Sequence, residues 1–599
     1  MTRQTTQGPV VPRRRRVTLA SLIVLAVATA TTATAGSPVG PPPGQPASAA
    51  RVAVPAESLS SAIRRRVAEM PPDSAYSRED WSRVQRLYET QQYPALWTDA
   101  SAPAQPLRSR GGVLVEALTS ASSQGLVPGG YLEAELRVAL GDVQRDPTSA
   151  EALARADVTL TAAFVAYATD LLTGQIDPRS VNREWHIDPH DVDVDSAVVG
   201  SLRHDAFAEA LGALRPHDPE YAALIPELAR YRELVANGGW PRVPTMGVLR
   251  PGDTTTAGSL GMLMGRLHAE RYTDLVPLVP VVQAGGVDTA AALGPDALVV
   301  YDAALSGAVA EYQRRHALEI DSIVGPNTLA SLNQPAEFRL RQIAANLERH
   351  RWLPRERGDR YVLVNVPAFR LRAYDGGREV LTMNVVVGAE YGGRTTPVFS
   401  DSMSYVVFRP YWNVPQSIAS EELWPKQQAD PSYFARNGYE TVRASWGTYV
   451  RQKPAPDNAL GRVKFIFPND YAIYLHDTPA QALFSERVRA FSHGCIRVEH
   501  PDQLAEFVLG PQGWDIGRVR EAMTGGEDDH RVNLERKLPV YIVYFTTFAR
   551  DGTLHFGNDI YDRDAALVRA VRGAETPGDS LAREVRGLRS VARALLDAR

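Results

Sequence analysis

The sequence predicts a multidomain α+β protein, and three observations lead to this fold class. The chain has 599 residues, which is too long for one hydrophobic core and corresponds to roughly three or four folded units. From residue 56 to about 240, Leu and Ala recur at the three- and four-residue spacing of helices. From about residue 360 onward, short runs rich in β-branched and aromatic residues are separated by turn residues, as in a β-sandwich or barrel.

The N-terminal segment has the pattern of an export signal. Four arginines at 13–16 precede an apolar stretch from 17 to about 30, followed by Ala33-Thr34-Ala35. A basic region, an apolar region and small residues before a cleavage point are the parts of a secretory signal. We expect residues 1–35 to be a signal peptide cleaved after Ala35, with an uncleaved membrane anchor as the alternative. The rest of the chain is then exported to the periplasm or cell envelope.

Residues 36–55 are rich in Pro, Gly, Ala and Ser and lack the large apolar side chains of a core, so we expect a disordered linker. The formal net charge is −4, from 65 Lys and Arg against 69 Asp and Glu. After the first residues the sequence has no long run of one sign. The composition therefore gives no indication of nucleic-acid binding.

Residues 56–240 are expected to form a helical scaffold domain, because turn residues such as Gly174, Pro178 and Pro216 separate its helical runs. The sequence of this region contains no catalytic cluster, and its role stays open. A smaller unit is expected over 247–333. It ends with VGPNTL at 324–329 and with Leu332-Asn333.

The pattern of residues 247–333 resembles the three-helix peptidoglycan-binding domain that occurs beside many cell-wall enzymes. The Val-Gly-Pro and Leu-Asn pieces carry this resemblance, which extends over nearly the whole segment. It implies that the unit binds peptidoglycan. A helical spacer that has kept the fold and lost the binding is the alternative.

Residues 360–550 are predicted to form a mainly β domain, with strands near 361–366, 369–371, 382–387, 463–467 and 540–544. Between 416 and 460 a polar segment with Pro and Gly interrupts the strands. Long insertions beside a site often act as lids, so we expect a capping insertion here. The final segment, 573–599, is a C-terminal tail with a helical pattern.

Cys495 is the single cysteine of the chain and cannot form an internal disulfide. A lone cysteine in an exported protein is most often a buried small apolar residue. Here, however, it lies in the hexapeptide SHGCIR at 492–497. A thiol attacks a carbonyl as thiolate, and a nearby histidine can take its proton. The neighbouring residues therefore favour a nucleophile.

Two histidines are candidates for the base. In a strand over 471–476 the side chains would alternate, so that Tyr474 and His476 project from one face. His493 lies two residues before Cys495, with Gly494 between them in a tight turn that exposes the thiol. We expect His476 to be the base and His493 to orient the loop, with His493 as base the alternative.

His476, fifteen intervening residues and then SHGCIR resemble the signature of the L,D-transpeptidase (YkuD) catalytic domain. The segments PYWNVPQSI at 410–418 and NALG at 458–461 support the resemblance, which extends over residues 60–570. It implies a YkuD-like catalytic domain and an acyltransferase of cell-wall biogenesis and cell shape. Cys495 would attack the carbonyl of a diaminopimelate residue in a stem tetrapeptide and release the terminal D-alanine. The acyl group would then pass to a diaminopimelate amine of a second stem, with His476 moving the protons.

The resemblance implies further roles around the nucleophile. The backbone N–H groups of Gly494 and Cys495 are expected to hold the oxyanion, with the Tyr474 hydroxyl as a further donor. Arg497 is expected to bind a substrate carboxylate, because its planar guanidinium suits that group. Many members of the family have Asn at this position, and a structural arginine is the alternative.

Ser492 and Trp412 are also expected to contact the substrate. Trp412, Trp424 and Trp446 would line the donor groove or, as the simpler interpretation, pack the insertion. The sequence has no set of His, Cys, Asp and Glu at metal-ligand spacing, so no metal and no cofactor are predicted.

Other functions use the same residues. Water in place of the amine would make the protein an L,D-carboxypeptidase, and a protein acceptor would make it an enzyme that anchors proteins to the wall. A non-catalytic peptidoglycan-binding scaffold is the alternative from another class. The expected partners are peptidoglycan stem tetrapeptides as donor and acceptor. A membrane tether through the N-terminal segment and other wall-synthesis proteins are further candidates.

Overall fold

The computed structural model describes residues 58–68, 76–127, 130–131, 134–187, 192–274, 294–390, 393–550, 552–571 and 579–597. They divide into two compact units. The helical unit holds the described residues of 14–118, 130–166 and 583–599, and the mixed unit holds those of 119–129 and 167–582. The predicted export signal and linker lie outside the described residues. Among the described residues, no helix is long and apolar enough to cross a membrane.

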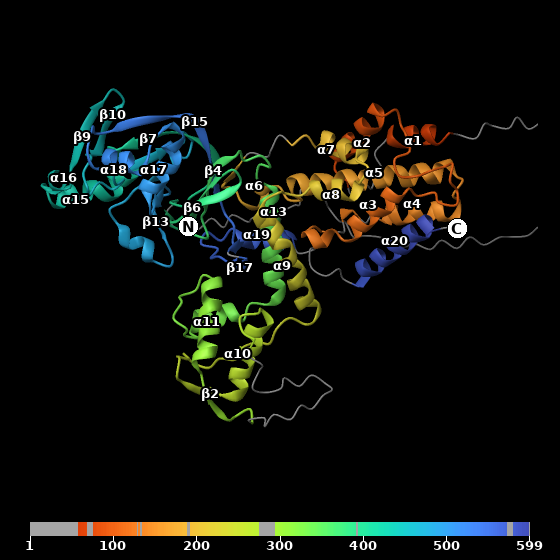
Figure 1. Ribbon diagram of the computed structural model, residues 1–599, viewed down its shortest axis with the longest axis horizontal. Coiled ribbons are helices and arrows are strands. Elements are labelled where there is room, and N and C mark those ends of the chain that lie inside the picture. Colours follow the sequence, from red (N-terminus) through yellow and green to blue (C-terminus); the bar gives the residue numbers. More distant parts are fainter. Residues whose placement is uncertain are drawn as a thin grey trace, which may run out of the picture. The chain divides into compact units, whose positions relative to one another are not determined.

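The helical unit is built around the first part of a long helix. Its helices are α1 (Leu59–Ala68), α2 (Arg78–Thr90), α3 (Ser109–Thr119), α4 (Ala134–Arg145), α5 (Ala150–Thr173) and α20 (Asp579–Asp597) (Figure 1). Almost every residue of α5 is buried, as expected for a helix that is apolar all round. Ser77 caps α2 by accepting a hydrogen bond from the Asp80 N–H.

One buried carboxylate of α5 organises the loop after α2. Asp157 is fully buried and accepts hydrogen bonds from the N–H groups of Leu96, Trp97 and Thr98 at 2.8–2.9 Å. It also accepts from the Tyr88 hydroxyl at 2.6 Å. Buried donors that lose their acceptor each cost about 1–3 kcal/mol. The loop therefore depends on this side chain.

We predict that Asp157→Ala destabilises the helical unit by about 3–5 kcal/mol, the usual cost of removing one partner from a buried charged network. Hydrogen–deuterium exchange of amides 88–98 in the full chain should accelerate accordingly. Asp146→Ala is the control, since that exposed carboxylate bonds only within its own turn, and it should leave the exchange unchanged. Equal protection in both variants would contradict the prediction.

The mixed unit contains the remaining part of the predicted scaffold domain. Its helices there are α6 (Pro178–Val181), α7 (Val194–Arg203), α8 (Phe207–Ala213) and α9 (Pro219–Ala236). Leu224, Leu228 and Tyr231 of α9 belong to the same hydrophobic core as the strands of the β domain. Residues 56–240 are therefore helical but do not form one compact unit, because the buried face of α9 packs on the β domain.

A helix that the sequence analysis did not assign connects the parts of the mixed unit. α13 (Ala336–Arg351) packs against α9 and against α19 (Asp564–Ala570), and most of its residues are buried (Figure 1). Its buried cations are paired: Arg349 with Asp564 at 2.6 Å and Arg351 with Glu348 at 2.8 Å. These pairs make it possible for a helix rich in charge to lie in the interior.

Residues 247–333 fold around a small core of their own. Their elements are β2 (Thr254–Thr256), α10 (Ala257–Ala269), β3 (Leu298–Val300), α11 (Ala303–Arg315) and α12 (Pro326–Leu332) (Figure 1). Thr256 and Asp302 cap α10 and α11. Leu263, Leu267 and Tyr312 are fully buried in this core.

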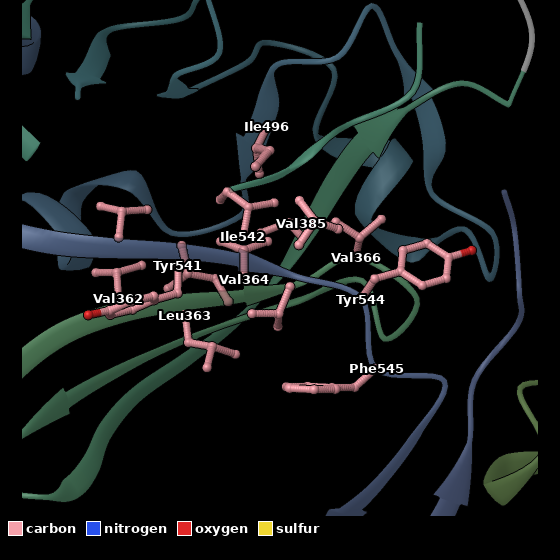
Figure 2. Close-up of a cluster of buried hydrophobic side chains, with 14 of the residues drawn as sticks. Val362, Leu363, Val364, Val366, Val385, Ile496, Tyr541, Ile542, Tyr544 and Phe545 are labelled. Carbon is pink, nitrogen blue, oxygen red and sulfur yellow. The ribbon is translucent and has the colours of Figure 1, made fainter. Parts of the chain in front are cut away.

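The β domain is a 10-stranded sheet that closes on itself. Its strands are β1 (Trp185–His186), β4 (Arg360–Asn365), β5 (Arg370–Asp375), β6 (Arg378–Gly388), β7 (Val398–Phe408), β11 (Val463–Ile466), β12 (Leu475–His476), β13 (Ala490–Ser492), β14 (Ile496–Val498) and β15 (His530–Val543). The order is β1-β7-β11-β12-β14-β6-β5-β4-β15, with β13 beside β6, and β15 also pairs with β7. Figure 2 shows Val364, Val385, Ile496 and Ile542, all fully buried, gathered from four of these strands. Burying each such side chain contributes about 1.5–3 kcal/mol.

The predicted mainly β domain and helical region are confirmed, and so are strands at all five predicted places. The predicted strand over 471–476 is wrong except for its last two residues. Ala472 has a φ of 54°, which is incompatible with a strand at this residue, and only Leu475 and His476 pair as β12.

The segment inserted after β7 has a separate small core. A three-stranded sheet has the order β8 (Trp412–Asn413), β10 (Gly447–Gln452), β9 (Tyr439–Ala444). It packs with α14 (Gln416–Ile418), a π-helical turn (Ala419–Leu423), α15 (Trp424–Ala429) and α16 (Tyr433–Arg436) (Figure 1). Ile418, Leu423 and Phe434 are buried among these elements. We call residues 412–452 the insertion.

Candidate active site

Two short parallel strands carry the candidate catalytic residues. β12 and β14 pair so that Leu475 lies opposite Ile496 and His476 lies opposite Arg497. Leu475 and Ile496 are fully buried in the core of the sheet. Since side chains alternate along a strand, His476 and Arg497 face the other way, toward the same pocket as Cys495.

This active-site pocket has a volume of about 410 Å³. The β domain and the insertion both line it. Its lining includes Arg394, Trp412, Ser417, Ile418, Glu421, Glu422, Leu460, Tyr471, Ala472, Tyr474, His476, Ser492, His493, Cys495 and Arg497. All eight residues singled out in the sequence line this pocket except Gly494, which is buried beneath it in the same loop.

Hydrogen bonds from two hydroxyl groups hold the loop before Cys495. Gly494 has a φ of 113°, and a Cβ at this position would lie 3.0 Å from Ile473, so a side chain is disfavoured. Thr396 donates from its hydroxyl to the Gly494 carbonyl at 2.8 Å. Ser492 donates from its hydroxyl to the Cys495 carbonyl at 2.5 Å. Ser492 therefore holds the loop, and its predicted contact with the substrate stays a prediction.

The thiol of Cys495 contacts the carbonyl group of a residue whose backbone is strained. Sγ donates to the Ala472 carbonyl oxygen at 3.6 Å. Ala472 is in the left-handed region, which costs energy for a residue with a side chain. Asn469 stabilises this turn by accepting from the N–H groups of Tyr471 and Ile473 and donating to the Ile473 carbonyl. Sequence analysis missed this turn.

His476 is oriented through one ring nitrogen. Nδ1 lies 2.5 Å from the Asp477 carbonyl oxygen, so it carries the proton and donates, which leaves Nε2 as the acceptor. No described residue forms a hydrogen bond with Nε2, although His476 is only 4% exposed. Cys495 and His476 are both described, and the structure has no hydrogen bond between them. The imidazole therefore presents an open acceptor in the pocket.

The Asp477 peptide is fixed by the segment 458–461. The Asp477 carboxylate accepts from the N–H groups of Arg462 at 2.8 Å and Thr478 at 2.6 Å. A Cβ on Gly461, whose φ is 60°, would lie 2.3 Å from the Asp477 carboxyl carbon. Asn458 is fully buried and accepts from the Leu460 N–H. The NALG motif thus positions the carbonyl that orients His476.

Burial sets the resting charge of the two candidate catalytic groups. It raises the pKa of Cys495 to about 11, opposed by hydrogen bonding with Tyr474 and by the charge of Arg497. Burial and then the Arg497 charge lower the pKa of His476 to about 3. At neutral pH the site therefore holds a thiol and a neutral imidazole, not a thiolate–imidazolium pair.

This resting state predicts a particular pH dependence of thiol alkylation. Below a pKa of about 11 the thiolate fraction rises about tenfold per pH unit. The rate of iodoacetamide reaction at Cys495, followed by mass spectrometry of the full chain, should be very low at pH 7 and still rise at pH 9. A plateau between pH 5 and 8 is the signature of an ion pair and would contradict the prediction.

Two groups of the pocket are candidate donors to an oxyanion. No described residue accepts a hydrogen bond from the backbone N–H of Cys495, as expected for a donor to an oxyanion. Tyr474 is the second candidate, since it lines the pocket with Cys495 and burial raises the pKa of its hydroxyl well above the ordinary value, which keeps it protonated. The Gly494 N–H instead donates to the Ser492 hydroxyl at 3.1 Å. The expectation that Gly494 supplies a free donor is therefore wrong in this state.

Arg497 is an unpaired cation. Among the described residues its guanidinium has no hydrogen bond or ion pair, and its Nε is buried without a partner. Burial lowers the pKa of Arg497, and the Cys495 side chain opposes this shift. A half-buried guanidinium without a counter-ion is poised to bind an anion.

The insertion contributes acidic residues that the sequence analysis missed. Glu422 lies 2.8 Å from Nε2 of His493. Arg394, from the loop before β7, lies 3.4 Å from Glu421 and 3.5 Å from Glu422. These residues lack a motif, and only the fold of the insertion brings them to the pocket. His493 thus joins the nucleophile loop to the insertion, in agreement with an orienting role.

Of the three tryptophans, only Trp412 lines the pocket, together with Tyr474. Trp424 packs on Phe434 with ring centroids 5.2 Å apart. Trp446 is 73% exposed.

Among the described residues, no group of His, Cys, Asp and Glu could hold a metal ion.

The chain is similar in sequence to a curated bacterial protein. A "Putative L,D-transpeptidase" of Haemophilus influenzae is 34% identical over 243 residues, which are 38% of this chain and 48% of that protein. The chain thus spans about half the length of the curated relative it matches. Two solved structures have low TM-scores, so nothing is inferred from them. The Ldtfm–avibactam carbamoyl enzyme is 14% identical, with 32% of this chain and 51% of that chain covered and a TM-score of 0.14. An L,D-transpeptidase from Xylanimonas cellulosilytica is 16% identical, with 50% and 99% covered and a TM-score of 0.15.

Two family models match separate parts of the chain. Residues 82–228 match a scaffold domain. Residues 359–542 match the YkuD family, described as the L,D-transpeptidase catalytic domain, and this range contains the whole pocket. Residues 359–542 are therefore an L,D-transpeptidase catalytic domain of the YkuD family.

Proposed function

We propose that the protein is a cell-wall L,D-transpeptidase that joins peptidoglycan stem peptides through an acyl-enzyme on Cys495. One observation carries the proposal. Within a YkuD domain, one pocket brings together the single thiol of the chain, the open Nε2 of His476 and the unpaired Arg497. These are a nucleophile, a base and an anion-binding group, as peptide acyl transfer requires.

In the first half-reaction, Cys495 attacks the carbonyl that precedes the terminal D-alanine of a stem tetrapeptide. The sulfur–carbon bond forms and the thiol proton moves to Nε2 of His476. The oxyanion is held by the Cys495 N–H and the Tyr474 hydroxyl. The carbon–nitrogen bond then breaks, and the departing D-alanine nitrogen takes the proton from His476.

Arg497 links substrate binding to the base. Its charge is one cause of the low pKa of His476, and the two residues are opposite each other on neighbouring strands. A donor carboxylate bound to Arg497 would neutralise that charge. The part of the lowered pKa of His476 that comes from the Arg497 charge is then relieved, while the larger effect of burial remains.

In the second half-reaction an amine of an acceptor stem attacks the thioester. The nitrogen–carbon bond forms, the carbon–sulfur bond breaks and the sulfur regains a proton through His476. The other proton of the acceptor ammonium leaves to water. Water in place of the amine gives the L,D-carboxypeptidase reaction from the same acyl-enzyme.

The remaining parts of the chain fit roles beside this chemistry. The insertion lines the pocket and would act as its cap. The helices of 247–333 would bind peptidoglycan, and the scaffold region would connect the parts. An exported protein in the periplasm or cell envelope, with or without an N-terminal tether, meets this substrate.

The test is to incubate the purified full chain with disaccharide tetrapeptide and identify the products by mass spectrometry. Dimers joined through two diaminopimelate residues are expected. Tripeptide alone would show a carboxypeptidase. Unchanged tetrapeptide, with protein that binds peptidoglycan, would favour the non-catalytic scaffold.

A further inference from the structure

The acidic edge of the active-site pocket belongs to a π-helical turn. Glu421 and Glu422 lie in the turn Ala419–Leu423, between α14 and α15, and both line the pocket with Cys495. π-Helical turns within helices are uncommon and are frequent at functional sites. The turn brings two consecutive carboxylates to the pocket that holds the nucleophile.

These carboxylates are only partly neutralised. The side chain of Glu421 is 65% exposed, and its contact with Arg394 is 3.4 Å. Glu422 contacts the same guanidinium at 3.5 Å. Charge-assisted hydrogen bonds are normally 2.7–2.9 Å long. The contacts of Arg394 with both carboxylates are therefore long enough for a charged ligand to replace them.

The arrangement is complementary to the free end of an amino acid. A primary ammonium fits between two carboxylates, and a carboxylate on the neighbouring carbon fits a guanidinium. The β domain separately supplies Arg497 beside Cys495. Two arginines thus line the pocket, and of these only Arg394 has carboxylates of the insertion beside it.

We propose that Glu421, Glu422 and Arg394 form the acceptor subsite and select amines that carry a carboxylate on the adjacent carbon. This rests on the proposed transpeptidation and specifies its acceptor. The ammonium binds Glu421 and Glu422, and the carboxylate binds Arg394. The contact of Glu422 with His493 fixes the subsite relative to the nucleophile loop. Amines without the carboxylate are poor acceptors.

The experiment uses the full chain, the tetrapeptide donor and two acceptors, D-methionine and D-methioninamide, which differ only in the carboxylate. For wild type, the kcat/KM with D-methionine should be at least about tenfold higher than that with D-methioninamide, because loss of one charged contact weakens binding by about this factor. Arg394→Gln should bring this ratio close to one. The double variant Glu421→Gln, Glu422→Gln should raise the acceptor KM about tenfold for both amines and lower the ratio of transfer to hydrolysis.

Glu440→Gln is the matched control, because Glu440 belongs to the same insertion and pairs with Arg451, and its acceptor KM should equal that of wild type. Arg394→Lys keeps the charge if the glutamine variant does not fold, and it should keep a preference for D-methionine. Wild-type transfer with no preference for D-methionine, or an unchanged acceptor KM in the double variant, would overturn the acceptor subsite alone. A wild type that forms no acyl-enzyme would overturn the proposed function and this inference with it.

Discussion

Replacing Cys495 by alanine is expected to lower the rate of cross-link formation by at least about a thousandfold, because removal of a catalytic nucleophile leaves only binding and oxyanion stabilisation. Cys495 is the single thiol of the chain, and no other residue can replace it. The rate is measured by mass spectrometry of dimers from disaccharide tetrapeptide. Release of D-alanine should fall by the same factor, since both products come from one acyl-enzyme.

Cys495→Ser separates the thiol from the shape of the site. A hydroxyl is far harder to ionise than a thiol, and His476 is a weak base in the resting site, so the serine variant should keep about 1% of the activity or less. Circular dichroism and binding to peptidoglycan should match wild type in both variants. A serine variant with wild-type activity would contradict the covalent mechanism.

His476→Ala is expected to have the second-largest effect, a loss of about 10²–10⁴ in the acylation rate. The imidazole is the group that can take the thiol proton, since Nε2 is open and Nδ1 is held by Asp477. Acylation is followed by stopped-flow mixing with the tetrapeptide donor. In the variant, the rate should rise steeply toward high pH, where the thiol ionises without a base.

The matched control is His500→Ala, because His500 lies five residues from Cys495 with a side chain that is 49% exposed. Its acylation rate should stay within about twofold of wild type. A loss of about 10²–10⁴ in the acylation rate of His493→Ala, with a normal rate for His476→Ala, would instead assign the base to His493.

The sequence allowed prediction of the parts whose chemistry is local. A thiol, a glycine and two histidines at fixed spacing identified the pocket residues, and alternation of apolar residues located the strands of the β domain. The positions of Tyr474 and His476 in one pocket were also predicted, although the reason was partly wrong. Ala472 lies in a turn with a positive φ, so the strand begins only at Leu475, and a positive φ at an alanine has no sequence signal.

Other features depend on contacts between distant segments. The Ser492 hydroxyl takes the Gly494 N–H that was expected at the oxyanion, because this loop closes on itself. Glu422 reaches His493 only through the fold of the insertion. α13 was missed because its charged residues suggest an exposed segment, and only their partners elsewhere, such as Asp564 for Arg349, make burial favourable.

The most direct test of the account is the intact mass of the full chain shortly after mixing with a stem tetrapeptide in the absence of an acceptor amine. The covalent mechanism predicts an added mass equal to the donor minus D-alanine, located on the peptide that contains Cys495 and absent from Cys495→Ala. Cross-linked product formed without any adduct on Cys495, or an adduct that persists in Cys495→Ala, would contradict it.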